Sequence, residues 1–496
     1  MNMGKDLTEV RSPQRPLVPD IVGLESGEPT FLRGIAIKAK THKRHRFRDL
    51  YRCLDAELLH HAWDALNKGA ASGVDRVTAQ AYAQDLHANI LALVERLKTK
   101  RYRAKLVRRV YIPKENGKQR PLGIPALEDR LVQLACTKVL NAIYEQDFLD
   151  CSYGYRRGCS AQDAVGELTK ELQFGPYHWL VEADIRGFFD RLDHDWLLEM
   201  LGQRIDDRAF LGLIRKWLKA GALETDGEVI HPETGSPQGG TVSPVLANVY
   251  LHFALDLWFE RVVKKTCRGK AMIIRFADDW VCAFQHEVDA VRFYRTLPKR
   301  LNKFGLEVAQ EKTNCLAFSR QQLRKGPRFT FLGFEFYWDK DRKGLPRVKR
   351  RTAPKKQQGA KRRIKEWIKD NRHLPKRAFV SGLNRRLTGH YNYFGIVGNG
   401  HSINGFYRWA MTCAFKWLNR RGGKRMSFTW QAFWQAVDRG LFRKPRIVAT
   451  ASRRVSARGC CLARREYNRG TGCGKTARPG LCRGHRVTGA PTARGL

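Results

Sequence analysis

The chain has 496 residues, of which 43% are hydrophobic, so it is long enough for several domains and apolar enough to fold rather than stay disordered. Its 92 Lys and Arg residues face only 48 Asp and Glu residues, and the formal net charge of +44 exceeds what solubility requires and indicates a polyanionic partner. No apolar run reaches the roughly 18–20 residues of a membrane-spanning helix, and residues 1–20 contain acids but no apolar core, so we expect no membrane association, no targeting leader and a cytoplasmic location.

The positive charge is concentrated towards the C-terminus. Residues 351–496 contain 34 basic and 4 acidic residues, whereas residues 1–350 contain 58 basic and 44 acidic residues. A moderately charged front portion therefore precedes an intensely basic one. Residues 446–496 are rich in Arg and Gly and carry one acid, Glu466, which predicts a basic tail that stays disordered until it meets nucleic acid.

The chain has 12 cysteines, and most of them, such as Cys136 and Cys282, stand alone in apolar stretches as reduced core residues do. The tail gathers Cys460, Cys461, Cys473, Cys482 and His485. A zinc cluster there stays open as an alternative, although no C-x2-C pair is present.

The first third of the chain predicts an arm, two helices, a hairpin and a long helix. Residues 1–45 show no sustained period and predict a flexible basic arm. Helical periodicity, hairpin strands around an Asn-Gly turn and a further helical run then follow, over residues 58–66 and 81–97 (helices), 107–114 and 119–125 (strands) and 127–148 (helix).

The middle of the chain predicts a mixed sheet with helical connections. Its elements are a strand over 179–185, a helix over 195–201, a glycine-rich loop over 235–244, a helix over 245–263, a strand–turn–strand unit over 273–281, a helix over 288–303 and strands over 314–318 and 329–334. This order is close to a ferredoxin-like split βαβ sheet with insertions, so the predicted fold class is α+β. From residue 354 the pattern is helical and basic, with interleaved aromatic residues.

Two strand ends carry the candidate chemistry. Asp278 and Asp279 lie at the tip of the strand–turn–strand unit, and Asp184 ends an earlier apolar strand. Adjacent like charges are unfavourable unless a cation compensates them, and strand-borne carboxylates that converge on hard cations suit two-metal phosphoryl transfer. Read alone, an exposed Asp-Asp pair is equally compatible with an ordinary turn, because Asp is a common turn residue.

Ordered motifs run from about residue 50 to residue 437. They are Asn67-Lys68-Gly69 with Gly73-Val74-Asp75, Ile112-Pro113-Lys114 with Arg120-Pro121-Leu122-Gly123-Ile124-Pro125, Ser152-Tyr153-Gly154-Tyr155-Arg156, Asp184 with Gly187-Phe188-Phe189-Asp190, Pro237-Gln238-Gly239-Gly240 with Ser243-Pro244, Phe276-Ala277-Asp278-Asp279, Gly305-Leu306-Glu307 with Lys312-Thr313, and Phe331-Leu332-Gly333-Phe334. Together they resemble the group II intron-encoded reverse transcriptases, or maturases, of the bacterial type. No pattern of that family's HNH endonuclease module is seen, so we expect a member without it.

The resemblance implies a right-hand polymerase, with fingers and a ferredoxin-like palm followed by an all-helical thumb or maturase domain. The expected divisions are a flexible basic arm (1–45), an N-terminal fingers extension (46–105), reverse transcriptase fingers and palm (106–350), a helical thumb/maturase domain (351–445) and a basic disordered tail (446–496). His390 stands where the thumb signature usually has Trp, and Phe276 stands where reverse transcriptases commonly have Tyr.

The resemblance also implies roles for individual residues. Asp184, Asp278 and the backbone carbonyl of Ile185 would bind two Mg²⁺ ions, with Asp279 as a third, supporting acid. The residues implied to bind the nucleotide are Lys114 and Arg120 on the triphosphate, Phe189 as a gate against a ribose 2′ hydroxyl, Gln238 beside the primer or nucleotide, and Lys312 near the triphosphate or the primer. Without the resemblance, Lys114 and Arg120 are equally compatible with solvated cations of a hairpin edge. Phe189 is then more often a core residue, Gln238 a polar loop residue and Lys312 a surface lysine.

The implied function is RNA-directed DNA synthesis with dNTPs on an RNA template and a DNA primer or target, together with binding of a group II intron RNA that promotes splicing and mobility. The resemblance places the protein in the bacterial cytoplasm, at the nucleoid when target DNA is bound, and leaves a homodimer open. Two alternatives remain: a splicing cofactor without polymerase activity, and a reverse transcriptase domesticated for host defence.

Overall fold

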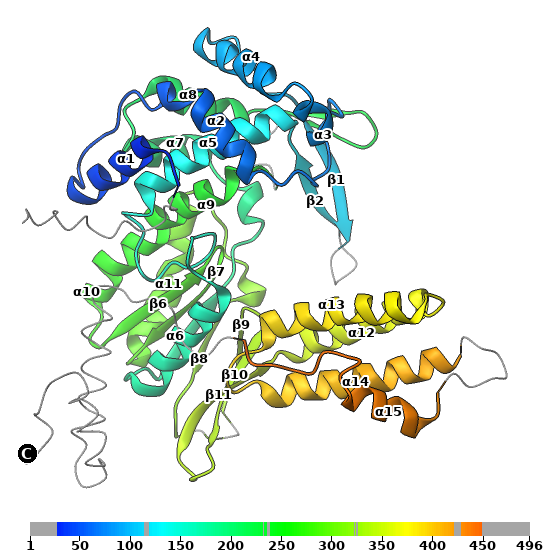
Figure 1. The fold of residues 1–496 in the computed structure, drawn as a ribbon. Helices are drawn as coiled ribbons and strands as arrows, with labels where there is room; N and C mark the ends of the chain where they lie inside the picture. The colour runs from blue at the N-terminus through cyan, green and yellow to red at the C-terminus, as the bar shows by residue number, and fades with distance from the viewer. Residues whose placement is uncertain are drawn as a thin grey trace, which may run out of the picture. The chain divides into compact units, whose positions relative to one another are not determined.

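The computed structural model describes residues 27–113, 119–231, 233–235, 239–321, 323, 326–420 and 428–448. These residues form two compact units that interleave along the chain (Figure 1). Unit 1 is built from described residues within Met1–Ile112, Gln119–Leu149 and Phe189–Tyr250, and unit 2 from those within Pro113–Lys118, Asp150–Phe188 and Leu251–Leu496. The predicted division at 106–350 therefore does not coincide with a single compact unit.

Unit 1 is mainly helical and is organised around α5 (Leu127–Tyr144), whose side chains are buried on almost every face. Its other helices are α1 (Thr30–Thr41), α2 (Ala56–Ala65), α3 (Ala79–Ala83), α4 (Leu86–Lys98), α7 (His194–Gly202), α8 (Arg208–Leu218) and most of α9 (Ser243–Leu251). A small sheet in the order β2-β1-β4-β5 contains β1 (Val107–Pro113), β2 (Gln119–Ile124), β4 (Ala222–Leu223) and β5 (Val229–Ile230). The helix predicted over 127–148 ends earlier, at Tyr144.

Helix α1 corrects the expectation of a flexible arm that reaches residue 45. It buries Leu32, Ala36 and Ala39 on one stripe, and it lies against α5 (Figure 1). The Arg204 guanidinium fixes its C-terminal end by donating to the Ala39 carbonyl at 3.0 Å. The sequence did not predict this helix because two of its three buried residues are alanines among lysines, so its hydrophobic periodicity is weak.

Unit 2 contains a four-stranded sheet in the order β6-β7-β3-β8, and each neighbouring pair is antiparallel. The strands are β3 (Trp179–Ala183), β6 (Ala271–Phe276), β7 (Asp279–Phe284) and β8 (Asn314–Ala317). Because successive side chains alternate between faces, Val281 packs on the side of α6 (Ala161–Phe174), whereas Phe284 meets Phe293 of α11 (Glu287–Asn302).

A second sheet of unit 2 has the order β11-β10-β9 and contains β9 (Phe329–Phe331), β10 (Phe334–Lys340) and β11 (Pro346–Thr352). The single strand predicted over 329–334 is thus two strands joined by the turn Leu332-Gly333. Strand β11 was not predicted, and neither were α6 and α8. The helix predicted over 245–263 is α9 followed by two π-helical segments, His252–Asp256 and Phe259–Val263, and by the short α10 (Lys264–Thr266).

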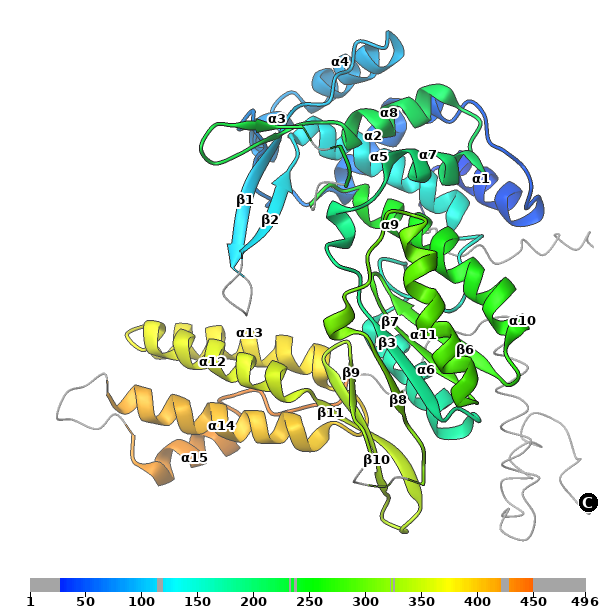
Figure 2. The same ribbon diagram turned by 180° about the vertical axis from the view of Figure 1, so that it is seen from behind.

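Four helices complete unit 2: α12 (Pro354–Asn371), α13 (Lys376–Phe394), α14 (Gly400–Asn419) and α15 (Trp430–Asp438). Figure 2 shows α12, α13 and α14 side by side, as their contacts require. Their shared core contains aromatic residues such as Phe379, Tyr391 and Phe433. At its margin, cations cover half-buried rings, as Arg386 covers Trp367 at 4.2 Å from the ring centroid.

His390 is half-buried beside this core, at a position where the family that the sequence resembles usually has Trp. Its imidazole stacks on Phe406 of α14 with ring centroids 3.8 Å apart. Burial, aided by the nearby charge of Arg363, lowers the pKa of His390 to about 4. The neutral imidazole of His390 therefore stacks on Phe406 as the flat ring of a Trp would, so His in place of Trp is compatible with the packing.

The pKa of His390 gives a testable pH dependence of stability. The folded pKa lies below the ordinary value of 6.5, so the stability that neutral His390 contributes is complete above pH 6.5 and is lost as the pH falls towards 4. Between these pH values we expect the free energy of unfolding of wild type to fall by roughly 3 kcal/mol more than that of His390→Phe, measured by denaturant unfolding. The control is His401→Phe at an exposed site of the neighbouring helix, which should leave the pH profile unchanged. Parallel pH profiles for His390→Phe and wild type would contradict the assignment.

Candidate active site

The tip of the β6–β7 hairpin presents Asp278 to its surroundings. Phe276 pairs with Asp279, so Ala277 and Asp278 form a two-residue turn between the strands. Ala277 has a φ of +57°, in the left-handed region that glycine usually takes at such a turn. A non-glycine residue is held there only when surrounding contacts fix the backbone.

Strand pairing brings Asp184 to the same edge of the sheet. Strand β3 runs antiparallel to β7 with Ala183 opposite Trp280, so Asp184, which directly follows β3, lies beside Asp279, the first residue of β7. The Asp184 backbone is fixed by the Ala309 amide, which donates to its carbonyl at 2.8 Å. The next residue, Ile185, is 4% exposed and forms an antiparallel bridge with Val308. The three predicted acids therefore meet at one place in unit 2.

Lys312 joins this acidic group. Its ammonium forms an ion pair with the Asp184 carboxylate, and that hydrogen bond, followed by the charges of Asp184, Glu311 and Asp278, raises the pKa of Lys312. The lysine ends the short 3₁₀ turn Gln310–Lys312, and Thr313 separates it from β8. It neutralises part of the negative charge that the converging acids create.

Asp279 and Glu182 show the electrostatic consequence of that convergence. Partial removal from water and the charges of Asp278 and Asp184 raise the pKa of Asp279, although its carboxylate accepts a hydrogen bond from the Leu332 amide. Glu182 accepts a bond of 3.0 Å from the Thr330 amide, and burial together with the charge of Asp279 raises the pKa of Glu182 to about 7. Sequence reasoning missed Glu182, because an acid within an apolar strand is informative only once its partner, here the Thr330 amide, is known.

The donor set suits a hard cation. Within the described ranges, no three His, Cys, Asp or Glu side chains are grouped closely enough to form a complete metal site. Mg²⁺ does not require one, because it is commonly held by one or two carboxylates while substrate phosphates and water supply the remaining ligands. Two converging carboxylates whose charges raise the pKa of a neighbouring acid are the environment that such a cation relieves.

The other predicted site residues are distributed differently. Lys114 and Gln238 lie outside the described residues. Arg120 is exposed on β2, and Phe189 is 8% exposed in the 3₁₀ turn Phe188–Asp190; both belong to unit 1. Beside Gln238, Gly239 has a φ of +114°, and a Cβ there would lie 2.3 Å from the Gly123 carbonyl oxygen, so only glycine allows this close approach.

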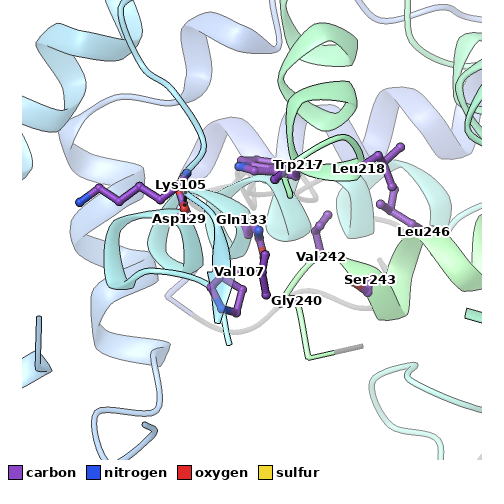
Figure 3. Close-up of a pocket in the computed structure, with 12 residues that line it drawn as sticks. Lys105, Val107, Asp129, Gln133, Trp217, Leu218, Gly240, Val242, Ser243 and Leu246 are labelled. Atoms are coloured by element: carbon purple, nitrogen blue, oxygen red, sulfur yellow. Dashed lines mark hydrogen bonds between the residues drawn. The ribbon is translucent and has the colours of Figure 1, made fainter. Parts of the chain in front are cut away.

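A small cavity in unit 1 lies beside the loop after Gly239 (Figure 3). Its volume is about 10 Å³, enough for one water molecule and far too small for a nucleotide. Gln133 of α5 accepts a bond of 2.9 Å from the Thr241 amide, and Asp129 accepts one of 3.0 Å from the Lys105 amide. This cavity is therefore part of the scaffold beneath the loop and not a substrate site.

Comparison with known proteins agrees with this geometry. Residues 112–336 match the family described as "Reverse transcriptase (RNA-dependent DNA polymerase)". Protein YkfC of Escherichia coli K12 is 31% identical over 301 residues, which are 53% of this chain and 79% of YkfC. The group II intron-encoded protein LtrA of Lactococcus lactis is 42% identical over 188 residues, which are 38% of this chain but only 30% of LtrA.

The chain belongs to the group II intron-type reverse transcriptase family. The matched region contains Asp184, Asp278, Asp279 and Lys312, so the acids that the sheet gathers lie inside the family's polymerase region. Helices α12 to α15 lie beyond it. A more distant relative, Nuclear intron maturase 3 of Arabidopsis thaliana, is 27% identical over 129 residues, which are 26% of this chain and 18% of that protein. No described helix is both long and apolar enough to cross a membrane.

Proposed function

We propose that the protein is an RNA-directed DNA polymerase encoded by a group II intron and that it also binds its intron RNA as a maturase. The observation that carries the proposal is the pairing of β3 with β7, which brings Asp184 to the hairpin that bears Asp278 and Asp279. In this assignment the four-stranded sheet of unit 2 is the palm, with the strand order of a split βαβ unit. Unit 1 corresponds to the fingers and helices α12 to α15 to the thumb.

Asp184 and Asp278, with the Ile185 carbonyl, would hold two Mg²⁺ ions. When bound, these ions supply a lowered pKa for the primer 3′ hydroxyl and stabilisation of the pyrophosphate leaving group. Asp279 supports the site from the first position of β7, where the Leu332 amide orients its carboxylate. The Lys312 ammonium is paired with Asp184. When the nucleotide enters, this ammonium would exchange Asp184 for a phosphate oxygen as its partner.

The remaining roles concern the incoming nucleotide and the template. Lys114 and Arg120 would bind the triphosphate, and Gln238 would contact the primer or the incoming nucleotide. The group II intron RNA, the RNA template and the DNA primer or target are the polyanions that match the charge of +44. A bacterial cytoplasmic location, at the nucleoid during DNA targeting, completes the proposal.

A splicing cofactor without polymerase activity is the second candidate. It predicts intron binding without DNA synthesis, whereas this chain keeps all three acids and brings them together. A domesticated defence enzyme is the third candidate, and it would synthesise DNA without promoting splicing of an intron RNA.

The decisive experiment is primer extension by the full chain on an RNA template with a DNA primer, dNTPs and Mg²⁺. We expect extension that EDTA abolishes, together with accelerated splicing of a group II intron RNA transcribed from the gene's own flanks. RNA binding without extension would support the splicing cofactor, and extension without any effect on splicing would support the defence enzyme.

The gate assigned to Phe189 gives a separate prediction. Phe189→Val should lower the preference for dNTPs over rNTPs, measured as the ratio of kcat/KM values, by roughly 10-fold or more, because a smaller side chain admits the 2′ hydroxyl. The matched control is Phe188→Val, which loses the same side-chain volume at an adjacent residue that is also buried, with 3% exposure. Equal changes in selectivity for the two variants would contradict the gate.

A further inference from the structure

A buried ion pair lies directly behind the Asp278 turn. Arg275, the next-to-last residue of β6, is bound in bidentate fashion by Asp256, with Nε to Oδ1 at 2.8 Å and Nη2 to Oδ2 at 2.6 Å. Both side chains are 0% exposed. Asp256 ends the π-helical segment His252–Asp256, and the neighbouring His252 has a pKa lowered to about 4 by burial, so it adds no charge near neutral pH.

The same guanidinium also holds the turn itself. Arg275 Nη1 donates to the Ala277 carbonyl at 2.9 Å, and Nη2 donates to Ser152 Oγ at 2.7 Å. The Ala277 carbonyl belongs to the peptide plane that leads directly into Asp278. Fixing this plane fixes the direction in which the Asp278 side chain leaves the backbone, because only the φ angle of Asp278 lies between them.

A second segment, residues 151–154, packs against the turn. Ser152 forms a parallel bridge with Arg275: the Arg275 amide donates to the Cys151 carbonyl, and the Tyr153 amide donates to the Arg275 carbonyl, both at 2.8 Å. A Cβ on Gly154 would lie 2.2 Å from the Ala277 amide nitrogen, so the chain backbone itself occupies this space. These contacts account for a left-handed Ala277 at a position that glycine usually takes.

We propose that Arg275, held by Asp256, is a positioning residue that locks the Ala277 peptide and thereby aims Asp278 at the metal ions; this inference rests on the proposed function. Stability alone does not account for the pair, because apolar residues of similar volume commonly stabilise a core as well as a buried ion pair does. What apolar residues cannot supply is a donor to the Ala277 carbonyl. Outer contacts that orient a metal ligand typically change metal affinity or activity 10- to 100-fold.

The test compares two double variants that each remove one ion pair. The double variant Arg275→Met/Asp256→Leu removes the proposed lock without leaving an unpaired charge. The control, Arg204→Met/Asp147→Leu, removes an ion pair of 2.9 Å in unit 1 between the buried Arg204 and the half-buried Asp147. For each protein we would measure the melting temperature, Mn²⁺ binding by the loss of the free-ion EPR signal, and kcat and KM for primer extension, with Asp278→Ala defining Mn²⁺ bound at the site.

We expect the Arg275/Asp256 double variant to fold, to bind Mn²⁺ at the Asp278-dependent site at least about 10-fold more weakly, and to lose 10- to 100-fold in kcat with an unchanged KM for template–primer. The control should keep wild-type Mn²⁺ affinity and kcat. Wild-type values for both in a folded double variant would overturn the proposal.

If the double variant does not fold, Arg275→Lys carries the test. It keeps a cation for Asp256 but loses the fork that reaches both Asp256 and the Ala277 carbonyl, so the same losses are expected. Unchanged Mn²⁺ affinity and kcat in that variant would refute the lock. Mn²⁺ binding also separates the two proposals. If wild type does not extend a primer but its Mn²⁺ affinity still depends on Arg275, the polymerase is rejected and the positioning role is retained.

Discussion

Asp278→Ala is expected to slow RNA-templated primer extension by at least about 10³-fold, because loss of one carboxylate from the proposed two-metal site would remove several kcal/mol of transition-state stabilisation. Affinity for template RNA should change little, because the substitution removes a negative charge and no phosphate contact. Asp184→Ala should be equally damaging, since Asp184 reaches the same edge from β3. Single-turnover primer extension measures these rates directly.

Two observations make this result specific. Removal of Asp278 relieves a like charge that helps to raise the pKa of Asp279, so the variant should be no less stable to heat than wild type. The control is Asp64→Ala, at an exposed acid of α2 in unit 1, and it should keep the full rate. A folded Asp278→Ala protein that retains more than about a tenth of the wild-type rate would remove Asp278 from the metal site.

The acids could be predicted from sequence because each is marked locally, by an apolar strand that ends in Asp or by a turn between two such strands. Their meeting could not be worked out in this way, since it depends on the register that places Ala183 opposite Trp280. Glu182 and Arg275 were missed for a related reason. A charge within an apolar strand has a meaning only when its partner is known, and those partners, Thr330 and Asp256, come from distant segments.

The missed elements have local causes. In β11 only Val348 and Thr352 are buried among basic residues, so the strand resembled the start of the basic helical region. Helix α6 did carry a readable signal, the capping box of Ser160 and Asp163, whose side chains bond each other's backbone amides. The interleaving of the two units could not be predicted from the sequence. The segment of unit 1 that begins at Phe189 follows β3 and Asp184 of unit 2 without a change of composition.

The basic helices of unit 2 predict that RNA affinity depends strongly on salt concentration. Helix α12 carries seven Lys or Arg residues and two acids. A groove of about 840 Å³ along α13 is lined by Lys376, Arg377, Arg385 and Arg443, with no acidic side chain among its lining residues. Such a surface binds phosphates by displacing counterions, so affinity should depend steeply on salt.

We expect the affinity for RNA to fall about 10³- to 10⁵-fold between 50 and 200 mM salt, as for a protein that contacts 6–10 phosphates, measured by filter binding or fluorescence anisotropy over a salt series. Arg377→Ala and Arg385→Ala should each reduce the slope of log affinity against log salt by about 1, independently of RNA sequence. The control is Lys349→Ala, because the charge of Lys349 is already offset by Asp339, at 2.8 Å. An unchanged slope in both arginine variants would place the RNA outside this groove, and a slope near zero for wild type would show that the charge of +44 does not act through phosphate contacts.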